Sequence, residues 1–310
     1  MYKLTKQQIK TIVDNASQRL FEYCRECNLH FLVTGSSGGL DSAITLGLAE
    51  KACQLAEKEN YQLISVGLIM PSHSKPEAET LGREAIQKFK AKEIKIDLSD
   101  VYDFIEDNYL EPIESAVLNI RREAGLAPDD ATMAWDLKVA HGNLKARSRM
   151  MLGTYNVARL LGSGLVLSTD NKSEQWMAFW THHGDVGDFG MIQELLKGLE
   201  LFDVARYLEV PAGIIAAKPD DGLAIAGGDE DQLGATYPNL DTIMISLIQK
   251  GFDPDGSREQ LKSLPIIEGF DPKVVESLAR RCINGAHKRR GCLNLTRTDL
   301  GISEIENIKL

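Results

Sequence analysis

Short apolar runs alternate with amphipathic segments over most of the chain. Apolar residues recur at helical spacing from Thr5 to about Cys27, which predicts an N-terminal helix over residues 5–28. Apolar runs of strand length occur at residues 31–33, 63–70, 94–97 and 165–168. Segments of helical character occupy residues 43–59 and 76–89 between the first three of them. This alternation predicts an α/β fold with a doubly wound, mostly parallel sheet and helices on both faces.

The middle of the chain departs from this alternation. Residues 101–161 are almost entirely helical in pattern, with interruptions near Gly125–Pro128 and at Gly142. This stretch is too long for a single crossover, so we expect part of it to form a subunit interface. Residues 216–238, rich in Gly and Asp, read as a long loop before further helices at 240–250 and 272–283. We expect one domain over residues 1–310.

A small-residue loop, Gly35–Ser42, joins the first strand to the next helix. A strand, a tight loop and a helix N-terminus in that order present free backbone N–H groups to an anion. Two adjacent glycines allow a phosphate to come close to the backbone. Ser37 and Ser42 add hydroxyl donors, and Asp41 adds a carboxylate suited to a phosphate-bound metal ion.

The composition of this loop excludes two common nucleotide motifs. It has no Lys-Ser/Thr pair after its last glycine, as a P-loop requires, and no G-x-G-x-x-G fingerprint. Its sequence, Ser-Gly-Gly-x-Asp-Ser, resembles the pyrophosphate loop of the ATP pyrophosphatases, which break ATP between its α and β phosphates. An ordinary glycine-rich turn is the alternative, and the loop alone leaves the particular enzyme open.

Polar residues also follow the strand at 165–168. In a doubly wound sheet, ligands bind at the carboxyl ends of the strands, so Thr169 and Glu174 are expected near the same nucleotide. Asn171 and Glu174 equally fit a capping box at the start of a helix. Asn143 and Arg147 share one helical face, either as a binding surface or as solvated polar residues.

The order of several motifs along the chain carries a more specific resemblance. The loop at 35–42 is followed by Gly142–Met150 (GNLKARSRM), Ser168–Glu174, Phe179–Asp185 (FWTHHGD), Leu196-Lys197, Gly228–Tyr237 (GDEDQLGATY) and His287–Arg289. This series is similar to that of the ammonia-using, single-domain NAD synthetases, over about residues 30–290. The resemblance implies an ATP pyrophosphatase fold of the adenine nucleotide alpha hydrolase type.

The resemblance also implies a two-step reaction. The nicotinate carboxylate of deamido-NAD attacks the α-phosphate of ATP, giving an adenylate and pyrophosphate, and ammonia then displaces AMP to leave NAD. Mg²⁺ and cationic side chains are expected to stabilise the charge that builds on the phosphates. The family's glutamine-using members carry an extra amidase domain, which the 30 residues before the first strand cannot contain, so free ammonia is the expected nitrogen source.

The family motifs assign expected roles residue by residue. By similarity, Asp41 and Lys197 are the catalytic residues, and Asp41 and Glu174 hold Mg²⁺. The ATP-binding positions are Gly35, Ser36, Ser37, Gly38, Gly39, Leu40, Asp41, Ser42, Thr169 and Lys197. The positions that meet deamido-NAD or shape its site are Asn143, Arg147, Arg149, His182, Asp188, His287 and Lys288. Taken singly, Lys197 also fits an exposed helix lysine, and the substrate-binding group fits a solvated charged surface.

Three positions differ from the family pattern. His182 stands where the family often has Lys, and Asp220 follows Lys218-Pro219 where many relatives carry a hydroxyl. The spacing from Gly184 to Asp188 is one residue short, so Asp188 rests on one choice of alignment. The differences at His182 and Asp220 support the alternative of a catalytically weak nucleotide-binding regulatory homologue.

Charge, hydropathy and cysteine content exclude several classes of protein. A net charge of −10 argues against a general nucleic-acid surface. No apolar stretch is long enough for a membrane span, and the polar N-terminus lacks a signal peptide, so a cytoplasmic protein is expected. Cys24 and Cys27 fit reduced helix cysteines better than a zinc or redox pair.

Another ATP pyrophosphatase, one that amidates or thiolates a nucleotide, is a further alternative for the function. The resemblance to the NAD synthetases also implies a homodimer.

Overall fold

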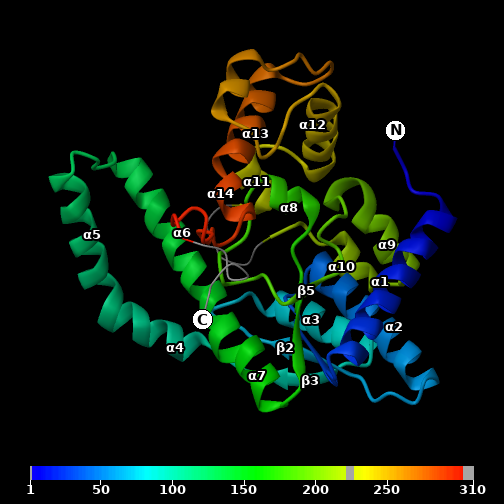
Figure 1. Ribbon diagram of the computed structural model, residues 1–310. Helices are drawn as coiled ribbons and strands as arrows, with labels where there is room; N and C mark the ends of the chain where they lie inside the picture. The colour runs from blue at the N-terminus through cyan, green and yellow to red at the C-terminus, as the bar shows by residue number, and fades with distance from the viewer. Residues whose placement is uncertain (1, 221–226, 303–310) are drawn as a thin grey trace.

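Five parallel strands form a sheet at the centre of the protein, in the spatial order β3-β2-β1-β4-β5 (Figure 1). The computed structural model describes residues 2–220 and 227–302. The strands are β1 (Phe31–Gly35), β2 (Ile64–Ile69), β3 (Lys92–Lys95), β4 (Gly164–Ser168) and β5 (Phe189–Gly190). This is the α/β fold predicted from the sequence. None of the helices in the two described stretches combines the length and apolar character that crossing a bilayer needs.

The helices fall into three groups by position. Those around the sheet are α1 (Lys6–Glu26), α2 (Leu40–Lys58), α3 (Pro76–Lys88), η2 (Arg149–Thr154), α7 (Tyr155–Leu160), η3 (Lys197–Leu201), α9 (Phe202–Tyr207) and α10 (Ala212–Ala216). Those of a projecting arm are α4 (Ser99–Ile105), η1 (Glu106–Leu110), α5 (Glu111–Glu123) and α6 (Asp130–Ser148). Those beside the carboxyl edge are α8 (Lys172–Trp176), α11 (Asp229–Leu233), α12 (Tyr237–Gln249), η4 (Arg258–Ser263), α13 (Pro272–Asn284) and α14 (Ala286–Arg289). Segments η1, η2 and η3 are π-helical, and η4 is a 3₁₀ helix.

Both faces of the sheet are buried because successive side chains along a strand point to opposite sides. Leu32 of β1 packs with α1 and α2 on one face. Its neighbour Val33 packs with Met150 and Val157, from η2 and α7, on the other. The apolar runs that predicted these strands therefore reflect burial on two sides, as is usual in parallel sheets.

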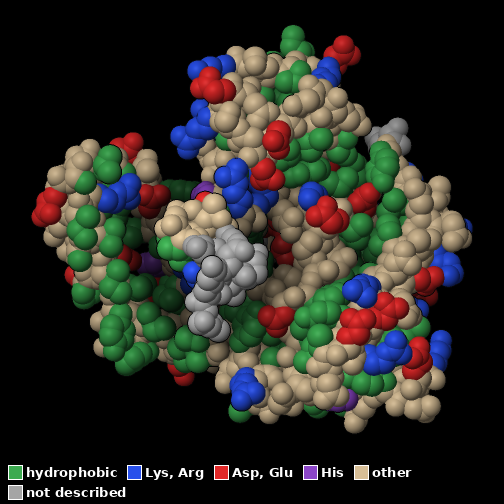
Figure 2. Space-filling model, viewed as in Figure 1, with side chains coloured by type: hydrophobic (Ala, Val, Ile, Leu, Met, Phe, Trp, Pro, Cys, Tyr) green, Lys and Arg blue, Asp and Glu red, His purple; other side chains and the backbone are tan. Residues whose placement is uncertain are grey.

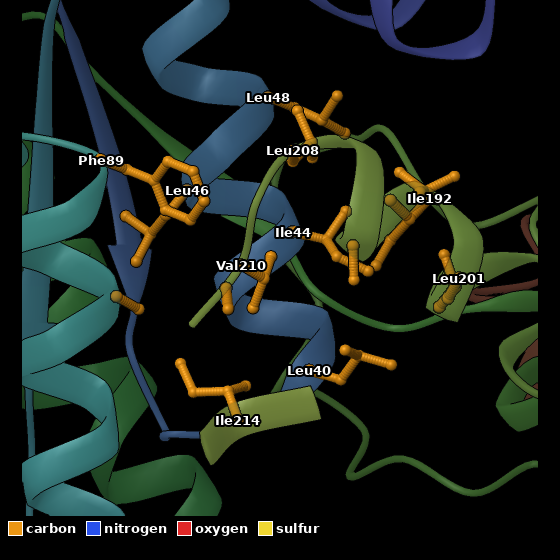
Figure 3. Packing of buried hydrophobic residues seen from close by; sticks show 14 of the residues in the cluster. Leu40, Ile44, Leu46, Leu48, Phe89, Ile192, Leu201, Leu208, Val210 and Ile214 are labelled. Atoms are coloured by element: carbon orange, nitrogen blue, oxygen red, sulfur yellow. The ribbon is translucent and has the colours of Figure 1, made fainter. Parts of the chain in front are cut away.

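Helix α2 is anchored by its first residue. Leu40 lies directly after the glycine loop, and its side chain joins the apolar cluster that α2 forms with Val210 and Ile214 (Figure 3). Farther along the same helix, Ile44 and Leu48 belong to this cluster. Because Leu40 is fixed in the core, the loop before it meets the helix N-terminus at a defined place.

The arm formed by α4, η1, α5 and the first part of α6 extends away from the sheet (Figure 1). Apolar side chains lie on its surface over α4 and α5 (Figure 2). Those more than 45% exposed include Phe104, Tyr109, Ile113, Val117 and Ile120. A lone exposed apolar residue is ordinary, whereas a group on neighbouring helical turns is typical of an interaction surface.

Three local predictions differ from the structure. The third strand begins at Lys92, two residues early, because the chain turns at Lys90 (φ 53°) and pairs at once with β2. Gly142 does not interrupt the helix but is buried within α6. Within 216–238 the structure forms α11, so the segment is not one continuous loop, and residues 221–226 lie outside the described residues.

The cysteines are all unpaired thiols. Cys24 is buried in α1, and Cys27 is exposed at the end of that helix. Burial raises the pKa of the Cys24 and Cys53 thiols to about 12 and that of Cys282 to about 11. Cys292 is exposed. Within residues 2–220 and 227–302 no group of three or more His, Cys, Asp or Glu side chains is arranged to hold a metal ion.

Candidate active site

The strand order changes direction between β1 and β4, which places the candidate site. The chain runs from β1 outward to β2 and β3, then returns to β4 on the other side of β1. A crevice opens beyond the carboxyl ends of the strands at such a switch point, and ligands bind there in doubly wound folds. The glycine loop follows β1 and the segment Thr169–Glu174 follows β4, so both predicted motifs meet at this place.

The glycine loop depends on the backbone of Gly38. This residue has φ +84°, and an added Cβ would lie 2.3 Å from the carbonyl oxygen of Ala78 on α3. Only glycine fits both constraints without strain. Gly39 then caps α2 with an extended backbone and no side-chain acceptor, so the first N–H groups of the helix stay directed into the crevice.

The serines of the loop have different surroundings. Ser36 is buried and donates its hydroxyl to the carbonyl of Gly82, 2.9 Å away, so its side chain ties the loop to α3. The hydroxyls of Ser37 and Ser42 lie 3.2 Å apart beside the helix N-terminus. Ser42 also donates to the Gly39 carbonyl at 3.1 Å, and Ser37 accepts the Gly39 N–H at 3.3 Å. Both hydroxyls thus lie at the place where the sequence predicts phosphate.

Lys197 lies at the centre of the site rather than on the surface. Its side chain is only 6% exposed, and Nζ lies 2.9 Å from Asp41 Oδ2 and 2.8 Å from Glu174 Oε1. Asp229 Oδ2 is 3.6 Å away. Three predicted residues from α2, α8 and the start of η3 thus converge on one buried ion cluster.

Burial and mutual charge determine the protonation of this cluster. Burial opposes the ammonium, but the carboxylates of Asp41 and Glu174 outweigh it and hold the pKa of Lys197 well above its usual value. Burial raises the pKa of Glu174, against the pull of the Lys197 ammonium beside it. The lysine therefore keeps its charge within the cluster.

Only half of the predicted capping box between Asn171 and Glu174 is present. Asn171 Oδ1 accepts the backbone N–H of Glu174 at 3.1 Å, so Asn171 caps α8. Its Nδ2 donates to Asp41 at 3.1 Å. The Glu174 side chain points instead to Lys197, so the cap orients the carboxylate toward the cluster.

Two further members of the cluster carried no role in the sequence prediction. Asp229 and Tyr237 belong to the Gly228–Tyr237 motif, which signalled their importance but not their place. The Tyr237 hydroxyl donates to Asp229 Oδ2 at 3.1 Å and lies 3.4 Å from Glu174 Oε1. The Lys197 ammonium sits 4.5 Å from the centre of the tyrosine ring, within cation–π range.

A third supporting residue, Asp241 of α12, gave no signal in the sequence. It accepts hydrogen bonds from Ser173 Oγ and from the backbone N–H of Gly198, the latter at 2.8 Å. Ser173 Oγ in turn accepts the N–H of Lys197 at 2.9 Å. This network fixes the backbone from which the lysine projects.

The donor set around Lys197 suits a magnesium ion. Asp41 and Glu174 offer oxygen ligands close enough to share one ammonium. Mg²⁺ is usually held by one or two carboxylates together with substrate phosphates and water. These two residues fit that requirement, whereas a site made of protein ligands alone would need more of them.

A second part of the site is a cavity of about 420 Å³ beside the cluster. Asp170 lines it, and the next residue, Asn171, bonds to Asp41, so cavity and cluster share the β4–α8 connection. Its other lining residues include Trp180, His182, His183 and Lys288. Lys288 Nζ donates to the carbonyls of Ala178 and Trp180 and lies 4.6 Å from the Trp180 ring centre.

Two basic groups that line this cavity, His182 and Lys288, are shifted toward their neutral forms. Burial, followed by the neighbouring His183, lowers the pKa of His182. Burial also lowers the pKa of Lys288 and raises that of Asp185 to about 7. Asp185 accepts the N–H of Thr181 at 2.7 Å, and Thr181 donates its hydroxyl to Asn143 at 2.6 Å. Asn143 therefore supports the turn that carries His182.

The remaining predicted residues are more dispersed. Arg147 donates to the His182 carbonyl at 3.1 Å, and Arg149 donates to the Met70 carbonyl at 3.0 Å, at the end of β2. Asp188 accepts from Tyr155 and from the N–H of Val166. It thereby braces the start of β5, away from the cluster, whereas Asp185 lies by the cavity.

Two more predicted positions stand apart from the Lys197 cluster. His287 lines a different, open cavity of about 490 Å³ with Asp255, Arg258 and Arg290. Thr169 is half-buried and directly follows β4. The structure thus brings Asp41, Glu174 and Lys197 together, and places His182 and Lys288 in the adjoining cavity.

Comparison with known proteins places the chain in a family. The profile of the NAD synthase family matches residues 12–292. The chain is 33% identical over 259 residues to the NH(3)-dependent NAD(+) synthetase of Methanocaldococcus jannaschii, covering 80% of this chain and 85% of the relative. Among solved structures, an NMN synthetase from Francisella tularensis aligns with a TM-score of 0.67 at 24% identity, over 93% of this chain and 98% of its own.

A second solved structure, an NH3-dependent NAD synthetase from Campylobacter jejuni, aligns with a TM-score of 0.62 at 21% identity, over 93% of this chain and 99% of its own. At such identities the two structures support the shared fold. The family profile and the archaeal relative carry the assignment, because each covers most of the chain. The chain therefore belongs to the NAD synthase family.

Proposed function

We propose that this protein catalyses the ATP-dependent amidation of deamido-NAD by ammonia, giving NAD, AMP and pyrophosphate. The observation that carries the proposal is the convergence of Asp41, Glu174 and Lys197 at the N-terminus of α2. A helix N-terminus, a buried lysine and two carboxylates make up the equipment that phosphoryl chemistry requires.

The reaction proceeds in two displacement steps. A nicotinate carboxylate oxygen bonds to the α-phosphorus of ATP while the bond to the bridging oxygen of the β-phosphate breaks, and pyrophosphate leaves. Ammonia then attacks the activated carbonyl carbon, AMP departs with its oxygen, and the nitrogen loses a proton. The first step turns a poor electrophile into one with a good leaving group.

The chain's own residues supply binding and charge. The N–H groups at the start of α2 and the hydroxyls of Ser37 and Ser42 hold phosphate oxygens, and Lys197 neutralises charge on the leaving pyrophosphate. Asp41 and Glu174 would hold Mg²⁺, which when bound withdraws charge from the phosphates. The cavity around His182 and Lys288 receives the nicotinate end of the substrate.

A product assay tests the proposal directly. Protein is mixed with ATP, Mg²⁺ and deamido-NAD, with either ammonium or glutamine as nitrogen source, and NAD, AMP and pyrophosphate are quantified. We expect equal amounts of the three products with ammonium and none with glutamine. A parallel reaction with nicotinate mononucleotide checks the substrate's size, because one structural neighbour is named an NMN synthetase.

Other outcomes of that assay distinguish the alternatives. ATP binding without NAD formation would favour a regulatory homologue. AMP release that requires a different nucleotide acceptor would favour another ATP pyrophosphatase. We also propose that the protein acts in the cytoplasm.

We also propose a homodimer that buries the arm. The apolar side chains along α4 and α5, which include Phe104, Ile113 and Ile120, support it. Sedimentation of the wild type should give a dimer, and Ile113→Glu with Ile120→Glu should shift it to a monomer. The matched control is Ile266→Glu, an exposed apolar position outside the arm. A fully active wild-type monomer would contradict the proposal.

A further inference from the structure

The buried cluster holds more negative groups than its lysine requires. Among the described residues, Lys197 Nζ lies within 4.0 Å of three carboxylates, those of Asp41, Glu174 and Asp229. The first two are also the residues suited to a divalent cation. Asp229, at 3.6 Å, is the third and is itself only 3% exposed.

The position of Asp229 is specified by its surroundings. Gly228 before it has φ +139°, a turn that L side chains rarely adopt, and the Asp229 N–H donates to the Pro219 carbonyl at 3.2 Å. Tyr237 donates its hydroxyl to the carboxylate at 3.1 Å and is itself only 1% exposed. The same tyrosine offers its ring to the ammonium at 4.5 Å. Asp229 and Tyr237 thus form a second holder for Lys197, built on α11 and α12.

The two pairs of residues would differ once a metal-bound nucleotide is present. Asp41 and Glu174 would hold a divalent cation through the oxygens that now face Lys197, and two like charges at that place would repel each other. The Asp229 carboxylate and the Tyr237 ring would remain as partners of the lysine.

We propose that Asp229 is a positioning residue that holds Lys197 toward the phosphates once Asp41 and Glu174 are engaged by the metal. The inference rests on the proposed function, since it requires binding of ATP and Mg²⁺. It assigns Asp229 a role that depends on metal, unlike a residue that merely balances a buried charge.

The test is a double-mutant cycle on ATP affinity, measured by calorimetry with Mg²⁺ and again with EDTA. With Mg²⁺, Asp229→Asn should weaken ATP binding about tenfold in the wild-type background. In the Lys197→Met background, the same substitution should leave the ATP affinity unchanged. With EDTA, where Asp41 and Glu174 still hold the lysine, it should change affinity less than twofold. Asp231→Asn, on the same helix but half exposed and paired with Lys218, is the matched control and should have no effect in either condition.

Two results would overturn the inference. One is an equal loss of affinity with and without Mg²⁺, and the other is a loss that persists in the Lys197→Met background. If Asp229→Asn does not fold, Tyr237→Phe replaces it, because it removes the hydroxyl bonded to Asp229 and keeps the ring. It should show a smaller loss with the same metal dependence. Failure of the wild type to bind ATP would instead refute the proposed function.

Discussion

The two halves of the candidate site are built in contrasting ways. Around Lys197, charged groups are buried and bonded to one another through Asp41, Glu174 and the Asp241 network. In the cavity of His182 and Lys288, both side chains are partly exposed, and the lysine is held by the backbone carbonyls of Ala178 and Trp180. A preorganised cluster suits the part of the reaction common to all ATP pyrophosphatases, and a more open cavity suits the part that recognises one substrate.

Removal of the Lys197 charge should have the largest effect and would test the preorganised half. Lys197→Met should lower kcat about a thousandfold, because a buried charge aimed at the phosphates is lost and carboxylates are left unpaired. Steady-state kinetics with ammonium as donor gives the value. Lys262→Met, an exposed lysine paired with Glu259, should keep wild-type activity. A loss below tenfold would mean that the cluster serves folding rather than catalysis.

The support beneath the cluster should show in the pH dependence of stability. Burial raises the pKa of Asp241 from 3.8 to about 6, so the native state binds its proton more tightly than the unfolded chain. Protonated Asp241 therefore makes its whole contribution to the free energy of unfolding below pH 3.8. That contribution decreases as the pH rises to 6, by roughly 3 kcal/mol at most. Urea unfolding at pH 4.5 and 7.5 should show this fall in wild type and a smaller one in Asp241→Asn. An equal fall in both proteins would exclude Asp241 as its source, and the exposed Asp100→Asn serves as control.

Two glycines with positive φ angles provide a matched pair of substitutions, one in the glycine loop and one outside it. Gly38→Ala forces a left-handed backbone and a contact of 2.3 Å with the Ala78 carbonyl, which we expect to weaken ATP binding about thirtyfold, from roughly 2 kcal/mol of strain. Gly125→Ala has a similar φ of +67° but no atom within 4 Å of the new Cβ. It should cost about 1 kcal/mol of stability and leave ATP binding intact. Equal ATP affinities in the two variants would show that the loop does not hold the phosphates.

The smallest effect on activity is expected from a substitution in the cavity of His182 and Lys288. His182 has a pKa lowered chiefly by burial, so it is neutral at pH 8. His182→Lys should lower the KM for deamido-NAD about fivefold at that pH, because it adds a cation worth about 1 kcal/mol, and should leave the KM for ATP unchanged. His183→Lys, its stacked and more exposed neighbour, is the comparison. A change in the KM for ATP instead would mean that the two halves do not act separately.

Local patterns predicted much of the fold and the core of the cluster. Three of the four apolar runs became strands with buried side chains, whereas the third formed the largely exposed edge strand β3. Gly38 marked the loop because few other residues fit its backbone. Asp41 and Glu174 lie in segments that follow predicted strands, whereas Lys197 was assigned only by the resemblance to the family. Asp241 escaped notice because its role depends on α12 packing against η3, a contact between residues 43 positions apart. Asp188 was chosen by aligning the Gly184–Asp188 segment with the family motif. In the structure it is Asp185 that interacts with Lys288 of the cavity, whereas Asp188 bonds to Tyr155 and Val166.

The accessible Cys292 provides a natural labelling site with which substrate binding could be followed. Cys24, Cys53 and Cys282 carry thiols that stay protonated, whereas Cys27 and Cys292 are accessible. Cys292 also lines the cavity that adjoins the Lys197 cluster. With Cys27→Ser as background, a fluorescent maleimide would attach at the rim of that cavity, and its emission would follow substrate entry in real time without any engineered tag.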